Sequence, residues 1–219
     1  GRAVARFLDI PSCSPIAPES GAEVVLEGGA IDVDGEGTLL TTEECLLDGT
    51  HARNPELGRA GHEAVLRESL GVSRVLWLGR GIAGDDTGGH VDDFARFGPG
   101  RTILLAQEPR RRDANHRVLE EARERLEGAR NAKGQKLEIV RLPMPEPVAF
   151  DGQRLPASYA NFYVGNAAVL VPTFNDPNDR VALGILGEVF RDRPVVGIHA
   201  RDLVLGLGTL HCSTQQEPG

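Results

Sequence analysis

The stretch DDTGGHVDD at Asp85–Asp93 follows the apolar run Val75–Leu78 and places one histidine, four carboxylates and two glycines within nine residues. Glycine adopts backbone angles that are closed to other residues. The pair Gly88-Gly89 in this stretch therefore predicts a sharp turn at the end of a strand. His90 and Asp92 are two residues apart and leave the same face if this segment is extended. A proton-transfer group beside a negative charge suits a cationic substrate, whereas an aspartate-rich surface turn is the structural alternative.

The same order of elements recurs around this stretch. The first round comprises a predicted hairpin, a helix and a strand, at Ile31–Leu47, Glu56–Leu70 and Val72–Leu78. The second comprises strands, a helix and a strand at His90–Phe97, Arg101–Ala106, Asp113–Leu126 and Leu137–Leu142. The third comprises the same elements at Ser158–Val164, Ala167–Pro172, Asp179–Phe190 and Pro194–Ile198. Strand–strand–helix–strand therefore occurs three times, which indicates a repeat architecture of α/β type.

Polar residues that carry chemistry stand near the start of each round. In chain order they are Glu27, His90 with Asp92, Tyr159 with Asn161, and finally Cys212. Cys212 lies in a second polar cluster, His211–Gln216, which follows the glycine-rich turn Gly206–Gly208. Modules arranged around an axis would bring these positions together. One pocket would then hold a thiol, an imidazole and carboxylates, which is typical of nucleophilic catalysis by cysteine at a positively charged carbon.

Composition limits the classes of protein to consider. The 219 residues can form one large α/β domain with a substantial core. A formal net charge of −8 argues against a nucleic-acid or anionic membrane partner and is compatible with a cationic ligand. Cys13, Cys45 and Cys212 lie far apart without CxxC spacing, so neither a disulfide framework nor a zinc site is predicted. With no apolar run approaching ~20 residues and no signal-peptide pattern, we expect a cytoplasmic protein.

Five motifs together resemble the agmatine deiminase family. They are EGG at 27–29, DGEGTLLTTEECL at 34–46, GHVD at 89–92, PASYANFY at 156–163 and HCSTQQ at 211–216. The family belongs to the guanidine-modifying enzymes related to the Porphyromonas-type peptidyl-arginine deiminases. The resemblance implies a pentein-type α/β propeller of about five ββαβ modules, of which this chain holds about three.

The resemblance also implies roles for individual residues. Cys212 would attack the guanidinium carbon as a thiolate, and a cationic substrate would help the thiol to ionise. His90 would protonate the departing ammonia and then activate the water that cleaves the thiouronium intermediate. Asp92 would hold the cation, and Glu27 would either hold the cation or orient His90. The remaining candidate substrate-binding residues are Asp86, Asn161 and Gly208. No metal or other cofactor is expected.

The chain departs from the family in three places. The family's N-terminal section, which supplies a further guanidinium-binding aspartate, has no counterpart here. Gly88 stands where the family usually has aspartate, and the family's triple glycine before the cysteine reads Gly-Leu-Gly at Gly206–Gly208. We therefore expect residues 1–219 to form a single domain that is the C-terminal portion of a longer propeller.

The resulting functional hypothesis is hydrolysis of agmatine to N-carbamoylputrescine and ammonia in polyamine biosynthesis, with a homodimer possible. The alternatives are a deiminase acting on peptidyl-arginine or another guanidino compound, and a non-catalytic remnant. For the other polar residues the structural interpretation is favoured: Cys45 as a core residue in a strand, and Asp32, Asp34 and Glu36 as parts of the hairpin turn. Tyr159 and Asn161 can line the pocket or pack the start of a module, and both alternatives stay open.

Overall fold

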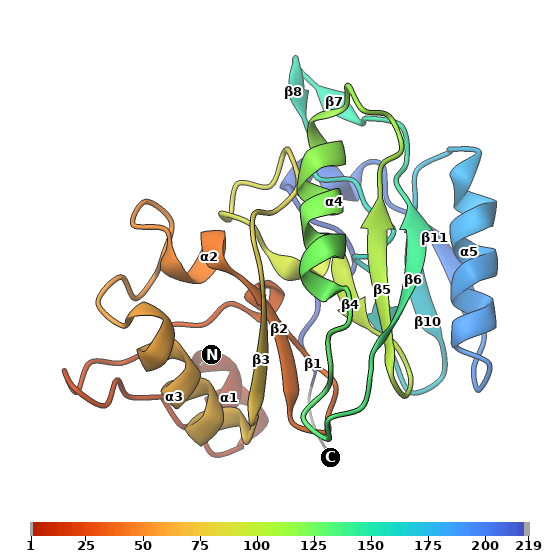
Figure 1. Cartoon of the computed structure of the whole chain (residues 1–219). Coiled ribbons are helices and arrows are strands. Elements are labelled where there is room, and N and C mark those ends of the chain that lie inside the picture. Colours follow the sequence, from red (N-terminus) through yellow and green to blue (C-terminus); the bar gives the residue numbers. More distant parts are fainter. Residues whose placement is uncertain (1, 217–219) are drawn as a thin grey trace.

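The computed structural model describes residues 2–216 and contains three modules of one type (Figure 1). The first comprises β1 (Ile31–Val33), β2 (Thr38–Thr42), α2 (Glu43–Leu47), α3 (Gly58–Leu70) and β3 (Arg74–Leu78). The second comprises β4 (Ala95–Phe97), β5 (Thr102–Gln107), α4 (Ala114–Leu126) and β6 (Glu138–Pro143). The third comprises β9 (Tyr163–Val164), β10 (Val169–Thr173), α5 (Asn178–Val189) and β11 (Val195–His199). The threefold order predicted from the sequence is confirmed.

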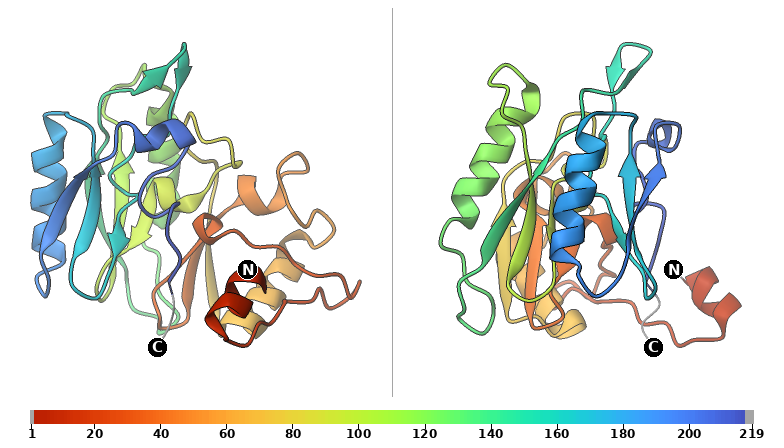
Figure 2. Two further views of the ribbon diagram at one scale, coloured as in Figure 1. Left: turned by 180° about the vertical axis from the view of Figure 1, so that it is seen from behind. Right: turned by 90° about the vertical axis from the view of Figure 1, so that its right-hand side faces the viewer.

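Each module is a three-stranded sheet in which the second strand is central. The strand orders are β1-β2-β3, β4-β5-β6 and β9-β10-β11. The first pair of each sheet is antiparallel and the second pair is parallel. A parallel pair cannot be joined by a tight turn, so a helix connects its strands. The three connecting helices lie at the periphery of the molecule (Figures 1 and 2).

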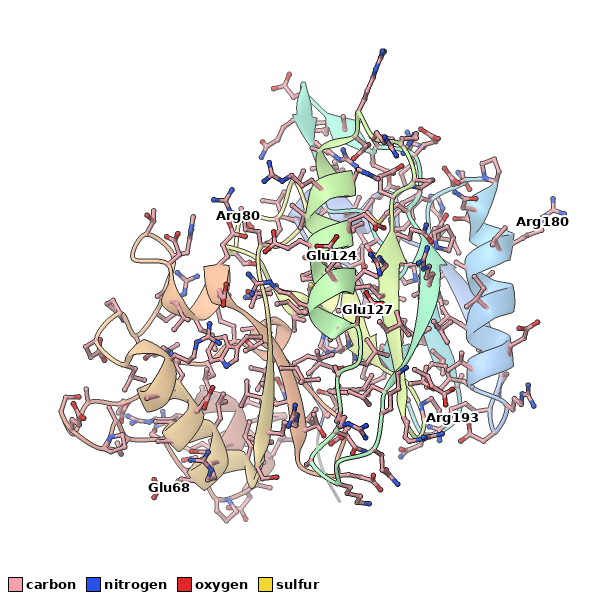
Figure 3. All side chains as sticks on the ribbon, viewed as in Figure 1. Glu68, Arg80, Glu124, Glu127, Arg180 and Arg193 are labelled. Atoms are coloured by element: carbon pink, nitrogen blue, oxygen red, sulfur yellow. The ribbon has the colours of Figure 1, made fainter. Side chains whose placement is uncertain are left out.

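The helices pack between neighbouring modules. The α4 helix contacts β3 of the first module as well as β5, and α5 contacts β6 of the second module as well as β11. The apolar core therefore joins Leu78 to Leu119, and Leu142 to Leu186. The outward faces are charged, and Figure 3 shows Arg180 pointing away from α5 into solvent. None of the helices within residues 2–216 has the length and apolar content needed to span a membrane.

A buried ion pair connects all three modules. The Arg96 guanidinium donates to Asp32 Oδ1 at 2.9 Å and to the carbonyl oxygen of Phe162 at 2.8 Å, and the amide of Phe97 donates to Asp32 Oδ2 at 2.6 Å. Asp32 lies in β1, Arg96 in β4, and Phe162 directly before β9. The prediction that Asp32 is a turn residue is wrong, whereas Asp34 does organise the turn by accepting from the amides of Glu36 and Thr38.

Replacing Asp32 by alanine is expected to lower the free energy of unfolding by about 3–5 kcal/mol, because it leaves the Arg96 guanidinium buried without a counter-charge. Urea unfolding followed by circular dichroism measures this loss. The matched control is Glu138→Ala. It breaks the ion pair between Glu138 and Arg101, whose side chains are 67% and 49% exposed, respectively. The control is expected to cost less than about 1 kcal/mol. Equal losses in the two variants would contradict a connecting role for Asp32.

Local structure differs from the prediction in the first module. Glu43–Leu47 forms the helix α2 and does not continue β2. Thr42 accepts a hydrogen bond from the amide of Cys45, which is an N-cap contact, and two acidic residues occupy the first turn, where they favour the positive end of a helix. Cys45 is a core residue as expected, 2% exposed, but it lies in this helix. In the segment before β1, Glu23 forms an isolated bridge with Ile16.

Two further segments differ from their predictions. Val91–Asp93 forms the 3-10 turn η2, so the strand β4 begins only at Ala95. The predicted strand 158–164 is reduced to β9 at Tyr163–Val164. In addition, the N-terminal segment contains the helix α1 (Arg2–Leu8), and a hairpin of β7 (Ala149–Phe150) and β8 (Gln153–Arg154) lies between the second and third modules. Two short 3-10 turns, η1 (Gly28–Ala30) and η3 (Leu203–Gly206), lie next to the candidate site.

Candidate active site

A pocket of about 400 Å³ lies where the segments before β1, after β3 and after β11 meet. Its wall includes five of the predicted site residues, Glu27, Asp86, His90, Gly208 and Cys212. These residues are separated by up to 185 positions in the chain, and the arrangement of modules brings them together. The convergence inferred from order along the repeat is therefore observed at this pocket for Cys212, His90 and Glu27.

The imidazole of His90 is paired with a carboxylate. His90 Nε2 lies 3.1 Å from Glu27 Oε2, and the other oxygen of Glu27 accepts from Arg53 at 3.0 Å. Burial acts to raise the pKa of Glu27, but the hydrogen bonds from Arg53 and His90 outweigh it and lower that pKa. Glu27 is therefore a stable carboxylate at neutral pH, and it orients the ring of His90.

The turn before His90 is held by Asp85. The carboxylate of Asp85 accepts hydrogen bonds from the amides of Gly89 and His90, each at 2.8 Å. Gly88 and Gly89 have φ of +87° and +93°, a conformation that favours glycine. At Gly88 a Cβ atom would also lie 2.5 Å from Cβ of His51. The close packing of His51 gives a physical reason for glycine at this position.

The sulfur of Cys212 lies beside two polar side chains. Asn161 Nδ2 is 3.0 Å from the sulfur, and the thiol lies 3.4 Å from Asp92 Oδ2. A Cβ atom on Gly208 would approach within 3.0 Å of the sulfur, so glycine leaves room for the thiol. Burial, together with the negative charges of Asp93 and Asp92, raises the pKa of Cys212. The thiol of the ligand-free protein is therefore protonated at neutral pH.

Asp92 is fully buried behind the pocket wall and has one oxygen without a partner. Its Oδ2 lies 2.7 Å from His211 Nδ1. Its Oδ1 makes no hydrogen bond to any residue in 2–216. Because a buried carboxylate oxygen without a partner is unfavourable, a donor from a ligand would be stabilised there. Gly29 packs closely against this oxygen, since a Cβ atom on it would lie 2.8 Å from Asp92 Oδ1.

Asn161 joins the residues around the thiol from inside the fold. Its Nδ2 is within hydrogen-bond distance of Asp92, Asp93 and the sulfur of Cys212, and its Oδ1 accepts from the hydroxyl of Thr209 at 2.8 Å. The Asn161 side chain thus hydrogen-bonds to other residues of the protein. Its predicted role in binding substrate remains a prediction. Burial and the charge of Asp92 raise the pKa of Asp93 well above its ordinary value.

The sequence interpretation missed two residues of the site and left the place of Tyr159 open. His211 and Asp93 both contact the site, and each directly adjoins a predicted residue, which is the only signal the sequence offers for them. Tyr159 does not line the pocket: its ring is buried in the core and its hydroxyl donates to Asp179 at 2.8 Å. The packing alternative therefore holds for Tyr159.

This arrangement favours a cation and supplies a nucleophile with a proton carrier. The pocket wall contains the carboxylates of Glu27 and Asp86, and an unpartnered oxygen of Asp92 lies behind it. A bound cation would offset the charges that raise the pKa of Cys212, and the thiolate is the reactive form of cysteine. His90 lines the same pocket and can carry a proton.

Comparison with known proteins gives consistent matches. Residues 2–218 match the family described as Porphyromonas-type peptidyl-arginine deiminase. The agmatine deiminase of Ectopseudomonas mendocina (strain ymp) is 41% identical over 231 residues, covering 97% of this chain and 61% of that protein. The solved agmatine deiminase of Enterococcus faecalis matches with a TM-score of 0.89 and 33% identity, covering 100% of this chain and 62% of that one.

Two further structures bear on the site and the fold. An agmatine deiminase from C. jejuni, with a cysteine replaced by serine and substrate bound, matches with a TM-score of 0.81 at 33% identity, covering 89% of this chain and 56% of that one. An amidinotransferase from Microseira wollei has a TM-score of 0.51 at 13% identity, over 84% of this chain and 45% of that one, and shares the fold alone. The pentein-type α/β fold predicted from the motifs is confirmed, and the chain spans 56–62% of the length of the deiminases compared here.

Proposed function

The chain belongs to the Porphyromonas-type peptidyl-arginine deiminase family, and we propose that it is the part of an agmatine deiminase that carries the nucleophile and the general base. The proposed reaction converts agmatine and water to N-carbamoylputrescine and ammonia, a step of polyamine biosynthesis. One observation carries the proposal: the Cys212 sulfur lies 3.4 Å from a buried carboxylate in a pocket that His90 and Glu27 also line.

The guanidinium group is proposed to bind between the carboxylates. The unpartnered Oδ1 of Asp92 accepts one N–H of the cation, and Glu27 and Asp86 supply negative charge at the pocket wall. Such charge-assisted hydrogen bonds hold a planar cation in a defined orientation. This orientation places the central carbon in front of the Cys212 sulfur.

The chemistry then takes place in two halves. The thiolate of Cys212 attacks the guanidinium carbon, and the resulting tetrahedral adduct expels ammonia as His90 donates a proton to the leaving nitrogen. The product of this half is an S-alkylthiouronium on Cys212. His90 then takes a proton from water, which attacks the same carbon, and the carbon–sulfur bond breaks to release the carbamoyl product and the thiolate. One water is consumed and one ammonia is released.

The raised pKa of Cys212 is consistent with a thiol that ionises when substrate binds. Burial and the charges of Asp93 and Asp92 disfavour the thiolate in the free protein. A guanidinium cation within a few ångströms of the sulfur offsets part of this negative charge and lowers the pKa of Cys212. The proton passes to His90 or to solvent. The site is thus inert toward neutral molecules.

Ammonia release from agmatine, free arginine and an arginyl peptide tests this proposal. Release from agmatine alone supports it. Release from the arginyl peptide favours a peptidyl-arginine deiminase, and release from none of them by the folded protein favours a non-catalytic remnant. A homodimer and a cytoplasmic setting remain part of the proposal; the three free cysteines among residues 2–216 are consistent with a reducing compartment.

Replacing Gly29 by alanine is expected to lower kcat/KM for agmatine roughly 100-fold, because a displacement of about 1 Å at reacting groups has that effect. The new Cβ atom would lie 2.5 Å from His90 Nδ1 and 2.8 Å from Asp92 Oδ1, so both groups must move. The matched control is Gly28→Ala, whose Cβ would meet only the flexible side chain of Gln215, at 3.3 Å. A loss at Gly28 as large as that at Gly29 would contradict this account.

A further inference from the structure

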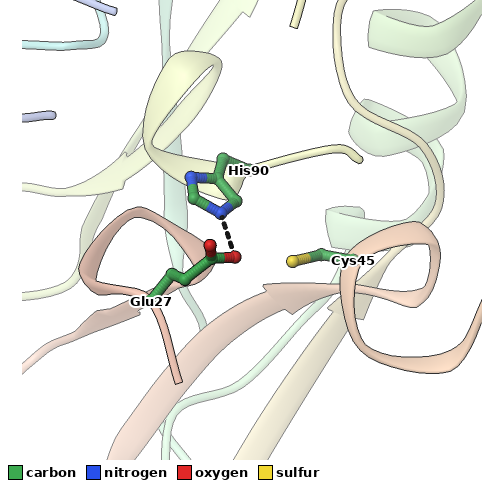
Figure 4. A group of neighbouring side chains, drawn as sticks. All are labelled: Glu27, Cys45 and His90. Carbon is green, nitrogen blue, oxygen red and sulfur yellow. Dashed lines mark hydrogen bonds and ion pairs between the residues drawn. The ribbon is translucent and has the colours of Figure 1, made fainter. Parts of the chain in front are cut away.

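A second cysteine, Cys45, lies next to the His90–Glu27 pair. The Cys45 sulfur, a carboxylate oxygen of Glu27 and a ring nitrogen of His90 all lie within 4.8 Å of one another. Figure 4 shows the sulfur pointing from α2 toward the Glu27 carboxylate and the imidazole. The proposed reaction assigns no role to this thiol, and a cysteine needed only for packing gains nothing from facing two polar groups.

The three side chains offer the donor set that zinc prefers. Thiolate, imidazole and carboxylate ligands together select Zn²⁺ over Mg²⁺ or Ca²⁺, which favour oxygen ligands alone. Zinc–ligand bonds of about 2.0–2.3 Å in a tetrahedral site place the donor atoms roughly 3.5 Å apart. His90 Nε2 and Glu27 Oε2 are already 3.1 Å apart. Small side-chain rotations therefore suffice to bring the three atoms around one ion.

The surrounding charge also favours a cation. The carboxylates of Glu27, Asp85 and Glu44 act on the Cys45 thiol, against the single guanidinium of Arg53. Burial and these carboxylates raise the pKa of Cys45 to about 12. A bound divalent ion would offset the negative charge that the carboxylates place around the thiol. Arg53 binds Oε1 of Glu27, which leaves Oε2 directed at the cluster.

We propose that Glu27, Cys45 and His90 form a binding site for Zn²⁺, and that the bound ion inhibits the enzyme. The ion replaces two protons: the thiol proton of Cys45 passes to solvent, and the proton between Nε2 and Oε2 is carried on Nδ1 of His90 instead. Glu27 and His90 also line the pocket of the candidate active site. The inhibitory effect, but not the binding, rests on the proposed function, because the ion would hold two side chains to which that function assigns cation binding and proton transfer.

Within the described part of the chain, a second cluster of possible metal ligands is the alternative site for the ion. Donor atoms of Asp92, Asp93 and Cys212 also lie within 4.8 Å of one another. Asn161 already engages all three side chains. A metal at this second group would therefore have to displace existing hydrogen bonds. The Cys45 group is the better site, and the two are distinguished by which thiol binds the ion.

Titration of the full chain with Co²⁺ tests the site without any activity measurement. Cobalt replaces zinc in such sites, and a thiolate ligand produces a charge-transfer band in the near ultraviolet. The wild-type protein is expected to show this band, Zn²⁺ to abolish it by competition, and Cys45→Ser to lack it. Cys212→Ser and Cys13→Ser are the matched controls and are expected to keep it. A band that persists in Cys45→Ser, or one that is missing from the wild type, would overturn the proposal.

Two additions keep the test decisive. Circular dichroism establishes whether Cys45→Ser is folded; if it is not, Glu27→Gln carries the test and is expected to weaken Co²⁺ binding on the order of 100-fold, since loss of a ligand costs at least as much as loss of its supporting contacts. Unchanged Co²⁺ affinity in Glu27→Gln would refute the site. Zn²⁺ is also expected to suppress ammonia release from agmatine, and a chelator to restore it. A Co²⁺ band in a protein with no deiminase activity would keep the metal site and reject the proposed function.

Discussion

Replacing Cys212 by alanine is expected to abolish ammonia release from agmatine, with a loss of at least about 10⁴-fold in kcat, because no other group at the site can form the covalent intermediate. Asn161 and Asp92 lie 3.0 Å and 3.4 Å from this sulfur, so the thiol is held where a cation bound to Asp92 would meet it. Cys45 has its sulfur beside Glu27 and His90 and is buried, and it cannot take over. Ammonia release under saturating agmatine measures the loss.

Two controls make the Cys212 result specific. Cys13→Ala removes an exposed cysteine outside the pocket and is expected to retain activity. Cys212→Ser keeps the shape of the side chain and is expected to bind agmatine without turning it over; the C. jejuni relative with a cysteine replaced by serine was solved with substrate bound. Turnover by Cys212→Ala at a rate comparable to the wild type would disprove the thiol mechanism.

Replacing Asp92 by asparagine is expected to lower kcat/KM about 10³-fold and, at the same time, to make Cys212 more reactive in the free protein. The two effects have one cause. The Asp92 carboxylate attracts the guanidinium, so its loss removes a buried charge-assisted contact. The same charge raises the pKa of Cys212, so its loss lowers that pKa and increases the thiolate fraction at any pH below it.

The rate of alkylation of Cys212 by iodoacetamide, followed by mass spectrometry against pH, measures the second effect. The alkylation profile of Asp92→Asn should shift to lower pH than that of the wild type. Glu36→Gln is the matched control because it also removes one negative charge, at an exposed position in the first hairpin, and it should not move the profile. An unchanged or upward-shifted profile in Asp92→Asn would show that the charge of Asp92 does not act on the thiol.

Local patterns in the sequence predicted the modules well. The apolar spacing at 57–70 and the glycine that follows predicted α3, which ends at Leu70 with Gly71 at φ +67° as its cap. Helix and strand periodicity depends on neighbours within a few residues, so it can be read without tertiary information. Where the chain offers two local solutions the reading was wrong, as at Glu43–Leu47, where a threonine cap favoured a helix over continuation of β2.

The candidate site was only partly predictable. Order along the repeat correctly placed Glu27, His90 and Cys212 in one pocket. It did not indicate that Asp32 pairs with Arg96, 64 positions away. An aspartate beside a turn is already explained by the turn itself, so the sequence gives no reason to look for a distant partner. Cysteine spacing likewise gave no sign of a metal site, because the ligands of the Cys45 group come from three separate segments.

By itself the sequence determined the module type and the number of modules and indicated the residues that the proposed reaction uses, because these depend on periodicity and on motifs of a few residues. Only the tertiary structure decided which of these residues touch. His211 meets Asp92 across 119 positions, and Cys45 faces a histidine from another loop. Such contacts depend on how three sheets pack around a shared centre, and neither spacing nor composition of the chain contains that geometry.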